Sequence, residues 1–392
     1  MTMACAALVA CGGGGGGSLG SADGSQTAPI ADGQAGTSLD LIGSSVDGAG
    51  LNAMVPPKAT NVGGEGSVVG SEGSSLAGAS PGSVADKGVV SPGLSAPSGG
   101  QRDYIAKPFA SDSPWNQPIP ANATYRKSDA RTTAVRNAGT FGTNNSKWTI
   151  WVWQAKESDP LVTVDVSVRH LTSSGNANAG KVTIRMPANA HADPEMDSHM
   201  TIIDPDGKHA HEFWYAKKRD KGFIAVSYAK VPLDGSGVNI SGYASHNSTY
   251  ETYGWGATRA YGGSQIAGLI RKGEVTQGPI EHAIAVALPA SNLGGRAVWP
   301  ATSDDQSPDY SGPIPMGSRF AIPPDVNLDS LGLSPEYLRL GRALQKYGLI
   351  VVDKSGSPCM YSEGLTAQAD GNALNKNRGQ MAVLQKLLVV VE

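Results

Sequence analysis

The chain has 392 residues and carries 31 Lys and Arg against 34 Asp and Glu, a formal net charge of −3. This balance argues against a general nucleic-acid-binding protein, because such proteins concentrate basic residues to neutralise phosphates. The three cysteines are too few for a disulfide framework.

Residues 1–11 have the features of a lipoprotein-like signal segment. Leu8-Val-Ala-Cys11 resembles the lipobox of bacterial lipoproteins, in which small residues precede a Cys that becomes lipidated. The basic residues that begin a signal peptide are absent from Met1-Thr-Met-Ala, so we expect a truncated segment and an upstream start codon. The alternative is an apolar disordered end. Lipidation at Cys11 predicts an exported protein: an outer-membrane or periplasmic lipoprotein, or a protein of the cell surface.

Composition divides the rest of the chain into three parts. Residues 12–100 are dominated by Gly, Ser, Ala, Asp and Val and contain none of the seven Trp or five Phe. They are therefore predicted to be a disordered linker. Residues 101–360 are predicted to form the functional domain. Residues 361–392 are a tail whose structure the sequence pattern does not predict.

Short alternating segments and frequent turn residues predict an all-β domain: an antiparallel β-sandwich or jelly-roll-like domain with one or two short helices. Strands are expected at 147–154, 161–168, 181–186, 223–228 and 280–288. The last is nearly continuous in apolar residues, which is typical of a central strand. A helix is expected at 334–347, with Ser334 as its N-cap and Pro335 at its first position. A second short helix is expected at 264–271.

The most informative stretch, 197–215, predicts a β-hairpin with two different faces. Asp204-Pro-Asp-Gly207 is a turn sequence, and with these four residues as the loop His199 lies opposite Glu212. One face then carries a polar set: Asp197, His199, Glu212 and Trp214. The other face carries a set suited to a core: Met200, Ile202, His211, Phe213 and Tyr215. A three-residue loop with a bulge is the alternative, and it would set His199 opposite Phe213.

Several motifs resemble a broad group of uncharacterised secreted bacterial and fungal proteins. They are Ser113-Pro-Trp-Asn116, His199-Met-Thr-Ile-Ile-Asp204, Glu212-Phe-Trp214, Ile280-Glu-His-Ala283, Val298-Trp-Pro-Ala301, Pro315-Met-Gly-Ser-Arg-Phe320 and Ala343-Leu-Gln-Lys-Tyr-Gly348. The resemblance spans about residues 103–355. It implies a single exported domain and no particular activity.

The polar face of the hairpin is suited to acid–base chemistry on glycans. Glycoside hydrolysis needs two carboxyl groups, and Asp197 and Glu212 are the candidates, with His199 and His282 as catalytic neighbours. Elimination at uronic acids instead needs a His or Tyr base and a residue that neutralises the substrate carboxylate. Residues able to supply these roles are His199, His282, Tyr253, Arg259 and Arg319.

Aromatic and basic residues are expected to bind the substrate, because flat rings stack on sugar faces. The candidates are Trp214, Trp255, Arg259, Trp299 and Arg319. The alternative for each Trp is packing in a sandwich core.

These features predict an envelope-tethered or secreted polysaccharide-degrading enzyme, a monomer, with hydrolysis favoured over elimination by a lyase. We expect a polysaccharide as the partner and a lipid anchor as the contact with the membrane. We expect no nucleic acid, cofactor or metal. One alternative is a non-catalytic carbohydrate-binding or surface-adhesion module. Another is a metal-dependent enzyme in which His209 and His211 bind the metal. The spacing of Asp204 and Asp206 also suggests a calcium site, although a turn explains that spacing without an ion.

Overall fold

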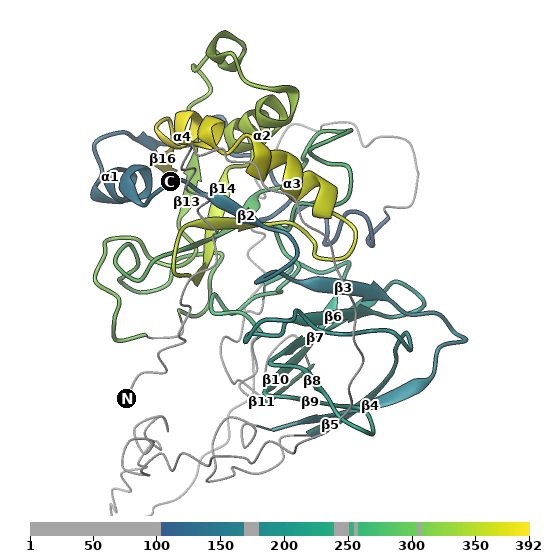
Figure 1. Cartoon of the computed structure of the whole chain (residues 1–392). Coiled ribbons are helices and arrows are strands. Elements are labelled where there is room, and N and C mark those ends of the chain that lie inside the picture. Colours follow the sequence, from purple (N-terminus) through teal and green to yellow (C-terminus); the bar gives the residue numbers. More distant parts are fainter. Residues whose placement is uncertain (1–102, 168–179, 239–250, 255–257, 305–306) are drawn as a thin grey trace, which may run out of the picture.

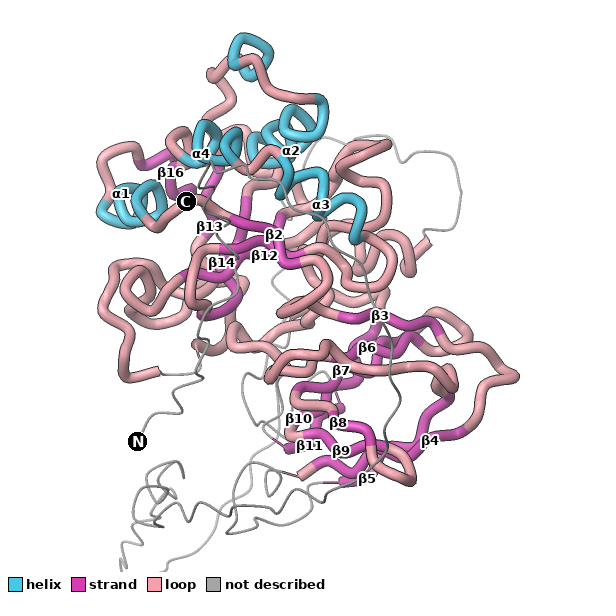
Figure 2. Tube along the Cα trace, in the orientation of Figure 1, coloured by secondary structure: helices cyan, strands magenta, loops and turns pink. Residues whose placement is uncertain are grey.

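The structure is a computed structural model that describes residues 103–167, 180–238, 251–254, 258–304 and 307–392. The predictions for residues 1–100, including lipidation at Cys11, lie outside the described residues. Within the described ranges, strands in three sheets predominate over helices (Figures 1 and 2). The expectation of a mainly-β fold is thus confirmed. The expected antiparallel sandwich is not, because each of the three sheets contains a parallel pair.

The largest sheet has seven strands. In order across the sheet they are β1 (Tyr125–Arg126), β16 (Val389–Val391), β13 (Arg319–Ala321), β14 (Leu349–Lys354), β12 (Ile284–Leu288), β15 (Cys359–Tyr361) and β2 (Gly142–Asn144). The apolar segment predicted to be central is β12, which lies between β14 and β15 and is buried throughout. It begins at Ile284, so His282 precedes the strand and does not belong to it.

In the part of the chain that the structure describes, four short α-helices accompany this sheet, more than the one or two expected. They are α1 (Ala130–Asn137), α2 (Pro335–Lys346), α3 (Gln368–Lys376) and α4 (Gly379–Gln385), with a 3-10 turn, η2, at Leu328–Leu331. Figure 1 shows α2, α3 and α4 grouped together above the sheet. Since α3, α4 and β16 all come from residues 361–392, this segment is built into the seven-stranded sheet and its cover.

One helix prediction is confirmed and the other is wrong. The side chain of Ser334 caps α2 by accepting from the backbone N–H of Tyr337, and Pro335 occupies its first turn as expected. Residues 264–271 form turns instead of a helix. Gly268 has a φ of +69°, which interrupts a right-handed helix.

Two smaller sheets lie face to face. The five-stranded sheet runs β11 (Glu251–Gly254), β10 (Ser227–Pro232), β7 (His209–Trp214), β6 (Met200–Ile203) and β3 (Trp151–Gln154). The four-stranded sheet runs β5 (Gly180–Arg185), β4 (Leu161–Val166), β9 (Phe223–Ala225) and β8 (Lys217–Lys218).

The five-stranded sheet buries both of its faces. Met200 and Phe213 pack toward Val164 of the four-stranded sheet in one hydrophobic core. Ile203 and Ala210 belong to the larger core, which also includes the seven-stranded sheet. Because alternate residues point to opposite faces, Glu212 shares the second face with Ala210. The site described below lies on this second face.

Candidate functional site

The hairpin of β6 and β7 keeps the predicted division of faces but not the predicted loop. Thr201, and not His199, pairs with Glu212, so the pairing lies two residues from the predicted one. The backbone N–H of Asp204 donates to the carbonyl of His209 at 2.9 Å, which leaves residues 205–208 as the loop. Since side chains alternate with a period of two, a two-residue shift returns each side chain of β6 and β7 to its predicted face.

Glu212 lies on this face with no exposure to solvent. Its carboxylate accepts hydrogen bonds from the hydroxyls of Thr258 (3.0 Å) and Ser264 and from the backbone N–H of Gln265 (2.9 Å). Burial raises the pKa of Glu212 to about 7, although these hydrogen bonds act to lower it. A carboxyl group with several protein donors and no solvent contact anchors residues 258–265 to the sheet.

Gln265 connects Glu212 to His199. Its side-chain Nε2 donates to the carbonyl of Met200 (2.8 Å) and to Thr201 Oγ1 (2.7 Å), which fixes the orientation of the amide. The amide oxygen therefore faces His199 Nδ1 at 2.7 Å and accepts a hydrogen bond from its N–H. His199 is thus held as the tautomer protonated on Nδ1, with a lone pair on Nε2.

The imidazole of His199 is neutral at physiological pH. Burial, helped by the positive charge of Arg259, lowers its pKa to about 3. The residue is 8% exposed, so the ring retains limited contact with solvent. Among the described residues, Nε2 has no hydrogen-bond partner, and it is therefore the nitrogen available as a base.

Asp197 supplies a carboxyl group two residues before His199. It is half-buried, and burial raises its pKa against the opposing effects of a hydrogen bond from the Trp214 side chain and of the charges on Arg259 and Lys217. A carboxyl group with a raised pKa keeps its proton to higher pH and can act as a general acid. The Trp214 side chain thus contacts Asp197, and His199 follows Asp197 by two residues.

The backbone around Asp197 is strained. Ser198 and Tyr215 have φ values of 43° and 55°, in the left-handed region that few residues other than glycine adopt. The two strained segments hold each other, because the N–H of Tyr215 donates to Asp197 O (2.8 Å) and that of Ala216 to Ser198 O (3.0 Å). Lys217 Nζ also donates to the hydroxyl of Ser198. Such strain costs about 1–3 kcal/mol per residue and is concentrated at functional sites.

Arg259 is buried, and its charge acts on His199. Its side chain is buried, with Nη1 donating to Gln265 O (3.0 Å), Nε 3.4 Å from Asp353 Oδ2 and the guanidinium over the ring of Tyr361. Burial acts to lower its pKa, but Tyr361 and Asp353 raise it above the ordinary value. Arg259 therefore supplies a fixed positive charge to the site.

Two of the remaining predicted residues, His282 and Arg319, lie away from this face. His282 lines a separate cavity, whose lining includes none of the residues of the polar face. Arg319 is on β13 of the seven-stranded sheet and donates to the carbonyl of Pro114 (2.6 Å). Trp299 is 63% exposed and belongs to the chain segment that connects β12 to β13. Trp255 lies outside the described residues.

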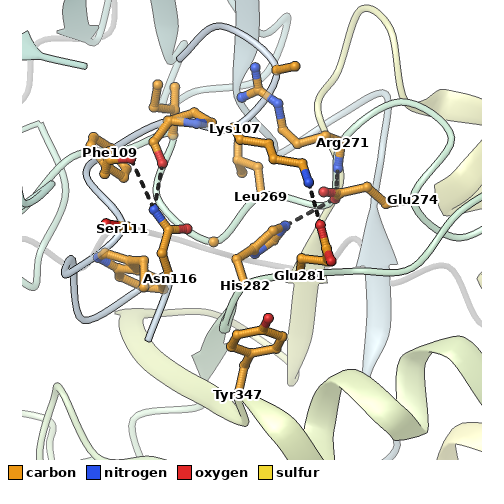
Figure 3. A pocket seen from close by; sticks show the side chains of 15 residues that line it. Lys107, Phe109, Ser111, Asn116, Leu269, Arg271, Glu274, Glu281, His282 and Tyr347 are labelled. Carbon is orange, nitrogen blue, oxygen red and sulfur yellow. Dashed lines mark hydrogen bonds and ion pairs between the residues drawn. The ribbon is translucent and has the colours of Figure 1, made fainter. Parts of the chain in front are cut away.

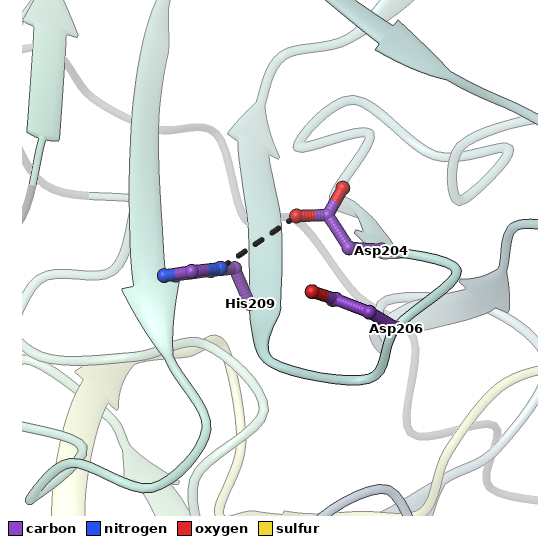
Figure 4. Close-up of side chains that lie close together, drawn as sticks. All are labelled: Asp204, Asp206 and His209. Atoms are coloured by element: carbon purple, nitrogen blue, oxygen red, sulfur yellow. Dashed lines mark ion pairs between the residues drawn. The ribbon is translucent and has the colours of Figure 1, made fainter.

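The hairpin loop carries a cluster of potential metal ligands. One ligand atom each from Asp204, Asp206 and His209 lies within 4.8 Å of the others (Figure 4). Asp204 also pairs with Nε2 of His211 (3.0 Å), and Asp206 accepts from the N–H of Lys208 (3.0 Å). These contacts account for the cluster as a turn, and we assign no metal to it.

Two residues of the site were not expected from the sequence. Gln265 fell within a segment expected to be helical, and Lys217 follows the hairpin at a position with no distinguishing motif. The Ser264-Gln265 pair is polar in an otherwise apolar segment, and this is the signal that could have indicated a buried partner.

No protein-family model, no curated protein and no solved structure matches this chain. The function is therefore inferred from the geometry of the site alone.

Proposed function

We propose that the protein is an exported enzyme that cleaves an acidic polysaccharide by elimination, with His199 as the base and Asp197 as the acid. The observation that carries this proposal is the state of His199. Its Nδ1 proton is fixed by Gln265, its ring is neutral, and its Nε2 has no partner among the described residues. A neutral imidazole with one available nitrogen is suited to proton abstraction.

The residues of the site can supply each step of an elimination at a uronic acid. His199 Nε2 takes the proton from the carbon next to the uronate carboxylate. The electron pair of that C–H bond forms a carbon–carbon double bond as the bond to the leaving glycosidic oxygen breaks. Asp197 donates its proton to that oxygen. Lys217, beside Asp197, neutralises the substrate carboxylate, whose charge grows in the transition state.

The charge of Arg259 links substrate binding to the basicity of His199. In the free protein this charge helps to hold the pKa of His199 low. A substrate carboxylate bound nearby opposes the effect of Arg259 and raises that pKa. The imidazole would therefore become a stronger base when an acidic sugar is bound, which favours acidic over neutral glycans.

Burial of Glu212 favours elimination over hydrolysis. A glycosidase needs two carboxyl groups on either side of the scissile bond. Glu212 has no solvent exposure, and its oxygens accept from three protein donors. Its proposed role is to position Gln265, and through it His199.

The test is incubation of the full chain with a panel of acidic polysaccharides, with neutral glucans as the control substrates. We expect new reducing ends together with the ultraviolet absorbance of an unsaturated uronate. Reducing ends without that absorbance would show hydrolysis and refute elimination. His199→Ala should lose activity by about a hundredfold or more. Lys217→Met should raise KM for acidic glycans, and Lys218→Met, at the exposed neighbouring position, is the matched control.

A non-catalytic carbohydrate-binding role is the second candidate, favoured by one observation. Trp299 is 63% exposed, and exposed tryptophan rings stack on sugars. Retention of the protein in gels that contain a polysaccharide, without cleavage and with loss of retention in Trp299→Ala, would support binding over catalysis.

A further inference from the structure

Lys217 is a half-buried lysine whose ammonium has no carboxylate partner among the described residues. In that part of the chain no carboxylate oxygen lies within 4.0 Å of its Nζ. Asp197 is close enough for the charge of Lys217 to lower its pKa, but the two side chains form no ion pair. Burying a charge is costly unless it is paired, so this ammonium is suited to an anion from outside the chain.

The cations of the cavity in Figure 3 differ from Lys217 in this respect. The cavity has a volume of about 180 Å³ and lies apart from the polar face. In its wall Lys107 pairs with Glu281, and His282 Nε2 lies 3.0 Å from Glu274 Oε2. Because these charges are already neutralised within the chain, the cavity has less to offer a charged ligand than Lys217 has.

Two neutral groups hold the ammonium of Lys217. It donates to Oγ of Ser198 and lies over the ring of Tyr215, 4.9 Å from the ring centroid. The Ser198 hydroxyl donates its own hydrogen bond to Glu195 O (2.6 Å), so its oxygen acts as an acceptor toward Lys217. A hydroxyl oxygen and an aromatic ring attract a cation without neutralising it. Since an ammonium has three N–H donors, at least one remains for a ligand.

The two residues that hold the ammonium are the two with strained backbone. Ser198 and Tyr215 both have left-handed φ values, and the N–H of Tyr215 donates to the carbonyl of Asp197. Such strain persists where the surrounding structure enforces it, and it is concentrated at functional sites. In this protein its effect is to bring a hydroxyl and a ring to one ammonium beside Asp197.

The chain that follows Lys217 is also basic. Lys218, Arg219 and Lys221 are exposed, and none of them forms an ion pair within the described ranges. Asp220 is the single acidic residue of the stretch 217–221. The surroundings of Lys217 therefore attract anions.

We propose that Ser198 and Tyr215 are positioning residues that hold the Lys217 ammonium so that it binds the free carboxylate of a uronic acid unit. This assignment rests on the proposed function and adds to it a requirement for the free acid. A methyl ester keeps the sugar ring but removes the negative charge, so the Lys217 site distinguishes the two forms. The preferred substrate is therefore a polyuronate that is not esterified.

The experiment is electrophoresis of the full-length protein in gels that contain a polysaccharide. The protein carries His199→Ala, which removes the proposed base and leaves the polymer intact. The probes are polygalacturonate, alginate and hyaluronate, each as free acid and as methyl ester. We expect at least one free acid to retain the protein, and its methyl ester to bind about tenfold more weakly or less. Equal retention by both forms, or no retention by any free acid, would overturn the proposal.

Two variants test the positioning of Lys217. Tyr215→Asn and Ser198→Gly place residues that tolerate left-handed backbone at these positions, so each removes a contact with the ammonium without adding strain. Each should weaken binding of the free acid about threefold to tenfold and leave binding of the methyl ester unchanged. Tyr215→Phe keeps the ring and should restore the binding of the free acid. Lys218→Met, which removes the neighbouring charge, is the matched control.

The outcomes separate positioning from packing. Equal weakening for the free acid and the methyl ester would attribute the loss to packing and contradict a positioning role. Unchanged binding in Tyr215→Asn and Ser198→Gly would contradict it as well. The comparison of the two polymer forms, made without these substitutions, decides the carboxylate requirement even if a variant does not fold.

Failure of this inference is distinct from failure of the proposed function, because retention needs no cleavage. Selective retention of the free acid, without an unsaturated product from the wild type, would support the Lys217 site and refute elimination. Elimination with equal rates on the free acid and the methyl ester would support the proposed function and refute the role of Lys217.

Discussion

Ionisation of Glu212 should make the protein less stable as pH rises. Burial raises its pKa in the folded chain to about 7, against an ordinary value of 4.5. Between these two values the folded chain keeps a proton that the unfolded chain releases, so the free energy of unfolding falls with increasing pH. Each unit of pKa difference corresponds to about 1.4 kcal/mol, so the difference between the two pKa values changes the free energy of unfolding by about 3 kcal/mol. This contribution is fully present below pH 4.5 and is lost as pH rises through about 7.

Glu212→Gln isolates the effect, because glutamine does not titrate. Urea unfolding of both proteins, followed by tryptophan fluorescence, gives their free energies of unfolding between about pH 4 and about pH 8.5. The free energy of unfolding of the variant minus that of the wild type should rise by about 3 kcal/mol from the low to the high end of this pH range. Contributions from all other titrating groups cancel in that difference. Glu157→Gln, at a side chain that is 81% exposed, should follow the wild-type profile.

The opposite outcome has a clear physical meaning. Burial and four hydrogen bonds compete for the pKa of Glu212, and burial is expected to dominate. If the free-energy difference stays constant or falls with increasing pH, the donors on Thr258, Ser264, Gln265 and Ile266 dominate. Glu212 would then be an ordinary buried carboxylate, and the reasoning from burial would be refuted.

Three further predictions test other parts of the molecule. Gln265→Leu removes the acceptor that fixes the proton on His199 Nδ1, so kcat on the cleaved glycan should fall about a hundredfold with little change in KM. Gly268→Ala places a Cβ 2.5 Å from the backbone N of Ala285 and should lower the free energy of unfolding by about 2 kcal/mol or more. Gly379→Ala is the control, because a Cβ there meets no atom within 4 Å and should leave the free energy of unfolding unchanged. Cys11→Ser should move the protein from the membrane to the soluble fraction of cells; unchanged fractionation would contradict a lipid anchor.

Local signals in the sequence predicted local structure well. Ser334, Pro335 and the apolar stripe that follows predicted α2, and the continuous apolar run predicted that β12 is central. The alternation along the hairpin predicted which side chains share a face. That prediction did not need the correct loop, because a shift of two residues preserves the face of every side chain.

Long-range pairing could not be predicted from the same signals. An apolar alternating segment reads the same whether its neighbour is parallel or antiparallel, so the parallel pairs β3–β6 and β4–β9 left no trace in the pattern. The site shows the same limit. Gln265 reaches His199 from 66 positions away, and only the fold brings them together.

The position of β16 has a consequence for how the chain folds during synthesis. This strand is made after every other strand of the seven-stranded sheet, yet it lies between β1 and β13. Arg126 beside it contacts Glu392 across 266 positions of sequence. Until Val389–Val391 leaves the ribosome, β1 has no neighbour and β13 has an open edge. Such high contact order slows folding, and all seven strands of the sheet can pair only after β16 has been translated.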